Sequence, residues 1–208
     1  MDRAPKIPSP PGYDQAYAQS YDLAFDGLAQ CDILEICHRA GASPGSNAVL
    51  RLNFLTIPVI VDVKQRTVKG VGFSLSITDK LIILHYLLTA NGQPNTGKLI
   101  SFKDLTDGSV YFPTFYKRAI APIIRKFGDS FSDLAVAATA LGGVLVPLGD
   151  FGISIPVLPN VTLNWVLWRG DEVSQAEGSI LFDARIIGYL PVEDIAAMCH
   201  SIAARLCA

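Results

Sequence analysis

FGISIPVLPNVTLNWVLW, residues 151–168, is the stretch of sequence that decides the fold class of this chain. Its apolar residues, many of them β-branched or aromatic, fall into two runs, 151–157 and 161–168, and the turn-forming pair Pro159-Asn160 separates them. The stretch carries no charge and has the length of a short membrane span, but its prolines and asparagines argue against a span. We therefore interpret it as two strands joined by a short connection.

The rest of the chain supplies further strands and several helices. Alternating β-branched residues predict strands over 49–55, 58–63, 67–75 and 179–182. Apolar residues at helical spacing predict helices over 14–40, 78–88, 111–127 and 191–206. We expect Gly41 to end the first helix, Thr78 to cap the second and Pro122 to kink the third. Helices grouped around strands with short connections indicate an α+β fold, with a mainly antiparallel sheet packed with several helices.

Length and composition are those of one globular domain with a substantial core. The chain has 208 residues, of which 50% are hydrophobic and 17% charged, with a formal net charge of -2. These values exclude a disordered polyelectrolyte and a surface built for nucleic acid, so we do not expect nucleic acid as a partner. We expect a flexible, proline-rich arm over 1–12 and a single α+β domain over 13–208. Without a secretory signal or a membrane span, the expected compartment is the cytoplasm.

The helix predicted over 78–88 carries the first candidate site. It is apolar nearly all round, which is typical of a central helix, so His85 and Tyr86 should lie near or in the core. A neutral imidazole in apolar surroundings can ligate a metal or haem, and His85, Tyr86 and Trp168 are our candidates for binding a cofactor, either a tetrapyrrole (corrinoid or haem) or a metal. The alternative is a core histidine bonded to a carbonyl or carboxylate. The four cysteines lack CxxC spacing, so neither a disulfide framework nor a zinc ribbon is indicated.

A basic segment suggests an anion site. Residues 98–126 hold six basic and two acidic residues, a balance of +4, and Lys98, Lys117 and Arg118 are the anion-binding candidates; a solvated face is the alternative. The segment 92-GQPNTGK-98 matches the start of a phosphate-binding loop, but it follows a helix instead of a strand, which favours an ordinary loop. His200 sits near a helix C-terminus, where the helix dipole explains it without a function.

Acidic residues near the predicted strand ends provide a third candidate site. Asp171, Glu172 and Asp183 could gather as a general acid and base. The alternative for Asp171 and Glu172 is turn formation after Gly170, while Glu193 is explained as a first-turn helix acid.

Several short motifs carry a family resemblance: 84-LHYLL-88, 98-KLISF-102, 167-LWRGDE-172, 180-ILFD-183 and 189-YLPVEDIA-196. Together they resemble the uncharacterised prokaryotic family designated domain of unknown function 3786. The resemblance implies a cytoplasmic accessory protein of anaerobic redox or corrinoid metabolism. Some members carry an added iron–sulfur segment that is missing here, and Val173-Ser174-Gln175 stand where the family continues with Glu-Phe-Pro.

Three functional hypotheses follow from the sequence. The first is a cofactor-binding or accessory protein whose partner is a small-molecule cofactor or a redox protein. The second is a small hydrolase or transferase that acts on an anionic substrate through an acidic general acid or base. The third is a structural partner protein, which includes a homo-oligomer. Convergence of the candidate residues on one pocket would favour the enzyme, and a roomy apolar cavity would favour the cofactor binder.

Overall fold

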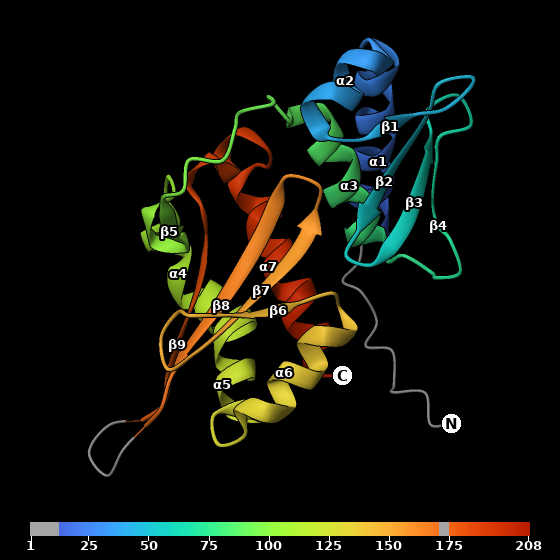
Figure 1. Cartoon of the computed structure of the whole chain (residues 1–208). Coiled ribbons are helices and arrows are strands. Elements are labelled where there is room, and N and C mark those ends of the chain that lie inside the picture. The colour runs from blue at the N-terminus through green and yellow to red at the C-terminus, as the bar shows by residue number, and fades with distance from the viewer. Residues whose placement is uncertain (1–12, 171–174) are drawn as a thin grey trace.

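A computed structural model describes residues 13–170 and 175–208 and shows an α+β fold with two antiparallel sheets (Figure 1). The predicted hairpin is the centre of the larger sheet: β7 (Phe151–Leu158) pairs with β8 (Val161–Trp168) around the Pro159-Asn160 turn. Three more strands complete this sheet in the order β5-β9-β8-β7-β6: β5 (Leu99–Ser101), β6 (Val144–Val146) and β9 (Glu177–Asp183). The expected arm over 1–12 lies outside the described residues.

The smaller sheet is a meander in the order β1-β2-β3-β4. Its strands are β1 (Ser43–Pro44), β2 (Val49–Phe54), β3 (Ile57–Asp62) and β4 (Thr67–Gly70). The Leu55 amide, just after β2, donates a 2.8 Å hydrogen bond to the Val157 carbonyl of β7. The two sheets are therefore joined directly, and one continuous apolar core runs through both parts of the molecule.

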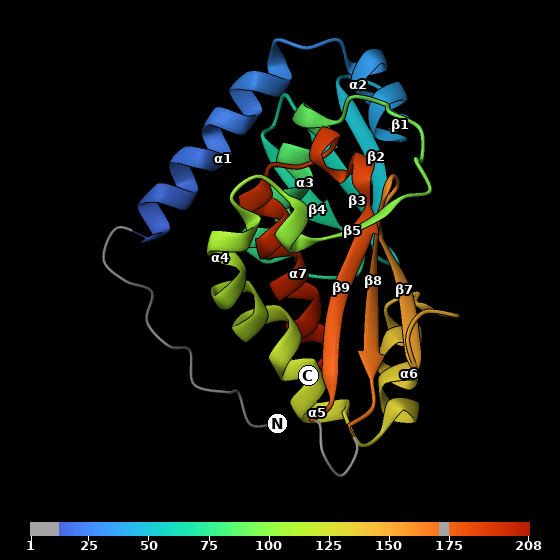
Figure 2. The same ribbon diagram turned by 90° about the vertical axis from the view of Figure 1, so that its left-hand side faces the viewer.

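Helices pack on both sheets, and α3 and α7 lie at the centre (Figures 1 and 2). Two ion pairs connect these helices: His85 of α3 with Asp194 of α7, and Asp79 of α3 with Arg205 of α7. The early part of α3 meets the late part of α7, so the two helices run antiparallel. The helices are α1 (Tyr13–Ala29), α2 (Ile33–Ala40), α3 (Ile77–Thr89), α4 (Gly108–Phe115), α5 (Ala121–Phe127), α6 (Phe131–Ala140) and α7 (Val192–Leu206), with short helices η1 (Phe102–Asp104), η2 (Tyr116–Ile120) and η3 (Ala184–Gly188). Within the described ranges, no helix has the length and apolar character needed to cross a membrane.

Two of the predicted helix starts are wrong. The helix expected over 14–40 is two helices, because Asp32 caps a new one: its side chain accepts a 2.7 Å bond from the Leu34 amide. Gly41 ends α2 in the left-handed conformation, as predicted. Ser76 caps α3 in place of Thr78, in a reciprocal capping box with Asp79. The helix expected over 111–127 is interrupted just before Pro122 by a π-helical turn, η2.

Candidate functional site

His85 is held by a carboxylate on the neighbouring helix. Its Nδ1 lies 2.7 Å from Oδ2 of Asp194, and both side chains are partly buried. The hydrogen bond with Asp194 raises the pKa of His85 against the opposing effect of burial. The geometry is that of the carboxylate-bonded core histidine weighed above as the alternative to a ligand.

Tyr86 and Trp168 do not join His85 in one pocket. The Tyr86 hydroxyl donates to the Ala40 carbonyl (2.6 Å) and accepts from the Asn160 amide (3.2 Å), and the side chain is fully buried. Tyr86 therefore lies beside the start of β8, whereas Trp168 ends that strand and is 40% exposed. β8 is eight residues long, so its first and last residues, Val161 and Trp168, are about 23 Å apart. The structure thus brings no cofactor site together from these three residues.

The loop that resembles a phosphate-binding loop already holds an anion, the carboxylate of Asp183. The amides of Thr96 (3.1 Å) and Gly97 (2.8 Å) both donate to Oδ2, and the Thr96 hydroxyl donates to Oδ1 (2.8 Å). The Arg185 amide adds a fourth donor at 2.9 Å. Burial alone would raise the pKa of Asp183, but these hydrogen bonds lower it. In this arrangement Asp183 anchors the loop before β5.

The remaining sequence candidates are scattered. Lys98 lies in the loop held by Asp183, whereas Lys117 and Arg118 lie in η2. Of these three, Arg118 lines the cavity described next, and the other two do not line it. Asp171 and Glu172 fall outside the described residues.

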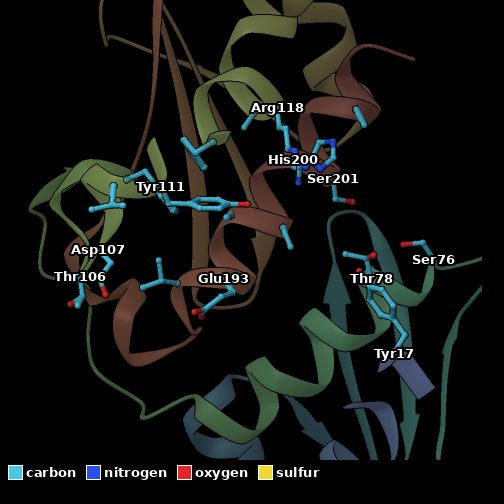
Figure 3. A pocket seen from close by; sticks show the side chains of 18 residues that line it. Tyr17, Ser76, Thr78, Thr106, Asp107, Tyr111, Arg118, Glu193, His200 and Ser201 are labelled. Atoms are coloured by element: carbon cyan, nitrogen blue, oxygen red, sulfur yellow. The ribbon is translucent and has the colours of Figure 1, made fainter. Parts of the chain in front are cut away.

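The cavity that Arg118 lines has a volume of about 810 Å³ and lies between α4 and η2 on one side and α7 on the other (Figure 3). The first residues of α3 and one residue of α1 close it. Its floor is apolar, with Phe102, Phe115 and Ala119 almost fully buried. The lining residues are Tyr17, Ser76, Thr78, Phe102, Thr106, Asp107, Val110, Tyr111, Phe115, Arg118, Ala119, Val192, Glu193, Ala196, Ala197, His200, Ser201 and Ala204.

Two irregularities of the backbone shape the wall of this cavity. Asp107, which precedes α4, has a left-handed conformation (φ 58°, ψ 4°) that is uncommon outside glycine. The next residue must be glycine, because a Cβ on Gly108 would lie 1.9 Å from the Phe102 carbonyl oxygen. Arg118 lies in the π-helical turn η2, and such turns occur frequently at functional sites. Both irregularities place charged residues on the cavity wall.

The charges of the cavity are separated. Arg118 and His200 lie together at one end and Asp107 and Glu193 at the other, with Tyr111 between them (Figure 3). Partial desolvation and the positive charge of Arg118 lower the pKa of His200, so its imidazole is neutral at neutral pH. One end of the cavity therefore presents a guanidinium beside a neutral imidazole, and the other presents carboxylates.

A buried hydrogen-bond network supports the cavity from below. Asp79 is fully buried and accepts from Ser201 Oγ (2.9 Å) and Arg205 Nη2 (2.6 Å). Ser76 Oγ also donates to Asp79, at 2.7 Å. Ser201 in turn accepts a bond from Arg205. The Ser201 hydroxyl thus donates a hydrogen bond to a carboxylate whose charge is already paired with Arg205, which is the geometry of a structural contact and not of an activated nucleophile.

Sequence reasoning singled out Arg118 but not the residues that share its cavity. The sequence analysis assigned His200 and Glu193 to helix-dipole effects and did not single out Tyr111, which is 44% exposed. A signal was present in the final helix: Glu193, Ala197, His200 and Ala204 repeat at spacings of four, three and four, so they form one stripe of small and polar residues. That stripe lines the cavity.

Comparisons with other proteins identify a family and no characterised relative. No curated protein and no solved structure matches the chain. Over the described residues, no group of three or more His, Cys, Asp or Glu side chains could hold a metal ion. The family described as "Domain of unknown function (DUF3786)" matches residues 32–205, most of the chain, so the chain belongs to this family, as the sequence motifs predicted.

Proposed function

We propose that this protein binds a small organic anion with an apolar body in the cavity between α4 and α7. The observation that carries the proposal is the cavity itself, which combines an apolar floor with Arg118 and a neutral His200 on one wall. Its volume of about 810 Å³ lies within the range of ligand pockets in proteins. Mostly apolar walls with a few converging polar groups are the usual composition of such sites.

Arg118 is the group that would hold the anion. Within the described residues no carboxylate forms an ion pair with it. A guanidinium binds a carboxylate or phosphate through two parallel hydrogen bonds, which are stronger than bonds between neutral groups. The neutral His200 beside it can add one further hydrogen bond to the same anion.

A tetrapyrrole is one member of this ligand class, and the residues of the cavity suit one. Arg118 would hold an acidic edge of the macrocycle, and the neutral imidazole of His200 would ligate its metal. When bound, such a group would supply redox or metal-ligand chemistry; this chain would supply binding and orientation. On this proposal the protein is a cytoplasmic accessory protein that serves a partner redox protein in anaerobic metabolism.

The enzyme hypothesis draws less support from the geometry. Asp183 is engaged by four donors, and the Ser201 hydroxyl is bonded to Asp79. Neither group is poised as a general base or nucleophile.

The proposal is tested first on the protein as its own host makes it. The protein should be purified without oxygen, and native mass spectrometry with UV–visible spectra will detect a bound ligand. Calorimetric titration with octanoate and with haemin then tests the ligand class. We expect Arg118→Gln to weaken binding of both probes at least about tenfold, the loss of one charge-assisted hydrogen bond or more.

Lys117→Gln is the matched control. Lys117 is exposed and lies in the same π-helical turn, but it does not line the cavity. Ala197→Leu, which places a larger side chain in the cavity, should also reduce binding while the protein stays folded. Equal affinity of the wild type and Arg118→Gln for octanoate would refute the proposal.

A further inference from the structure

The distribution of charge in the cavity points to a second recognition element. We propose that the ligand carries a positively charged group, such as a primary amine, about 10 Å from its anionic group. Glu193 and Asp107 would hold the amine while Arg118 and His200 hold the anion. This inference rests on the proposed function and narrows its ligand from organic anions to bipolar molecules.

The spacing of the two ends follows from α7. Glu193 and His200 lie on the same face of this helix, seven residues apart. With a rise of 1.5 Å per residue, their backbone positions are about 10 Å apart along the axis. Figure 3 shows Glu193 and Asp107 at one end of the cavity and His200 and Arg118 at the other. At this separation the two charged ends do not pair with each other, so both are available to a ligand.

The carboxylates at the acidic end of the cavity are not held in ion pairs. In the described part of the chain, neither Glu193 nor Asp107 forms an ion pair, whereas the adjacent Asp194 pairs with His85. Asp107 stands at the N-cap of α4, where aspartate commonly accepts a backbone hydrogen bond, yet its side chain makes no capping bond. Both carboxylates face the cavity instead. Asp107 thus occupies an uncommon backbone conformation without performing the usual capping role.

The region between the two ends selects the body of the ligand. Ala196 and Ala197 leave room along α7, and Phe115 contributes an apolar surface from α4. A ligand that reaches both ends must therefore cross an apolar stretch, which fits a hydrocarbon chain or an aromatic ring system. A diacid of the same length would meet Glu193 and Asp107 with a like charge, so the site should discriminate against it.

Three probes of equal chain length test this inference: octanoate, 8-aminooctanoate and octanedioate, titrated by calorimetry at pH 7. We expect the amino acid to bind at least about tenfold more tightly than octanoate, and octanedioate to bind least tightly. Glu193→Gln should remove most of the preference for the amino acid over octanoate. Glu177→Gln, at an exposed position of β9 that does not line the cavity, is the matched control.

The outcomes separate this inference from the proposed function. If octanoate binds through Arg118 and the amino group adds no affinity, the inference is wrong and the proposed function stands. The proposed function is wrong if Arg118→Gln leaves the affinity for octanoate unchanged, or if octanoate and 8-aminooctanoate both fail to bind at millimolar concentration. In either case the inference is wrong as well.

Discussion

Replacing Asp79 by asparagine should lower the free energy of unfolding by about 3 kcal/mol, because it leaves the partly buried Arg205 without its counter-ion. The Asp79 side chain is fully buried, and its carboxylate accepts four hydrogen bonds. They come from the Ser76 amide (3.1 Å), Ser76 Oγ (2.7 Å), Ser201 Oγ (2.9 Å) and Arg205 Nη2 (2.6 Å). These bonds connect α3 to α7 beneath the proposed ligand cavity.

The magnitude follows from the exposure of the partner. Removing one member of a buried ion pair costs about 3–5 kcal/mol when the other charge is left without water or a counter-ion. The side chain of Arg205 is 21% exposed, so water recovers part of the loss and the lower end of that range applies. For a chain of this size, each kcal/mol moves the melting temperature by about 2–4 °C, so we expect a decrease of about 6–12 °C.

Chemical denaturation followed by circular dichroism at pH 7 measures the effect. Asp129→Asn is the control, because Asp129 is exposed and its replacement should change stability by less than about 0.5 kcal/mol. Arg205→Met and the double variant complete a double-mutant cycle, in which the double variant should lose less than the sum of the single losses. A loss below about 1 kcal/mol for Asp79→Asn would refute the reasoning from burial.

The pH dependence provides an independent check. Burial alone would raise the pKa of Asp79, but hydrogen bonds from Arg205, Ser76 and Ser201 and the charge of Arg205 lower it. A lowered pKa means that the ionised carboxylate stabilises the folded state above the ordinary aspartate pKa of about 3.9, and that this contribution is lost as the pH falls through the folded value. The stability difference between the wild type and Asp79→Asn should therefore shrink below pH 4. A difference that stays constant down to pH 3 would contradict the assigned charge state.

Two further predictions concern residues that the sequence suggested as functional. The hydrogen bond with Asp194 raises the pKa of His85 despite burial, so its contribution to stability is complete below about pH 6.5 and is lost as the pH rises through the folded value. The melting temperature of the wild type should therefore fall more between pH 6 and pH 9 than that of His85→Gln, and parallel curves would argue against the ion pair. Asp183→Asn should speed hydrogen exchange at the amides of Thr96 and Gly97, because both donate to that carboxylate. Unchanged exchange there, measured by mass spectrometry, would show that other contacts hold the loop.

Local patterns in the sequence predict most of the secondary structure and the α+β class. The hairpin of β7 and β8 follows from two apolar runs around a proline-asparagine turn, and α7 follows from an apolar stripe with acids in its first turn. Both features depend on backbone geometry within a few residues. The two errors at helix starts, Asp32 and Ser76, also have local causes, since each residue is a good N-cap within a longer apolar pattern.

The candidate site depended on tertiary structure. Arg118 stood out in the sequence by its charge, but the opposite wall of its cavity comes from α7, near the other end of the chain. A helical pattern predicts which residues share one face of a helix, but it does not predict which other element packs against that face. For the same reason, Glu193 and His200 could be explained by the dipole of their own helix. Asp183 was a candidate catalytic acid in the sequence, and the structure shows that it binds the backbone of the loop before β5. The sequence by itself determined the strands, the helices and the fold class, because local backbone preferences and periodicity encode them. Only the tertiary structure showed that α4 and η2 pack against α7 and so bring opposite charges to one cavity. Such contacts between distant segments leave no periodic pattern in the sequence.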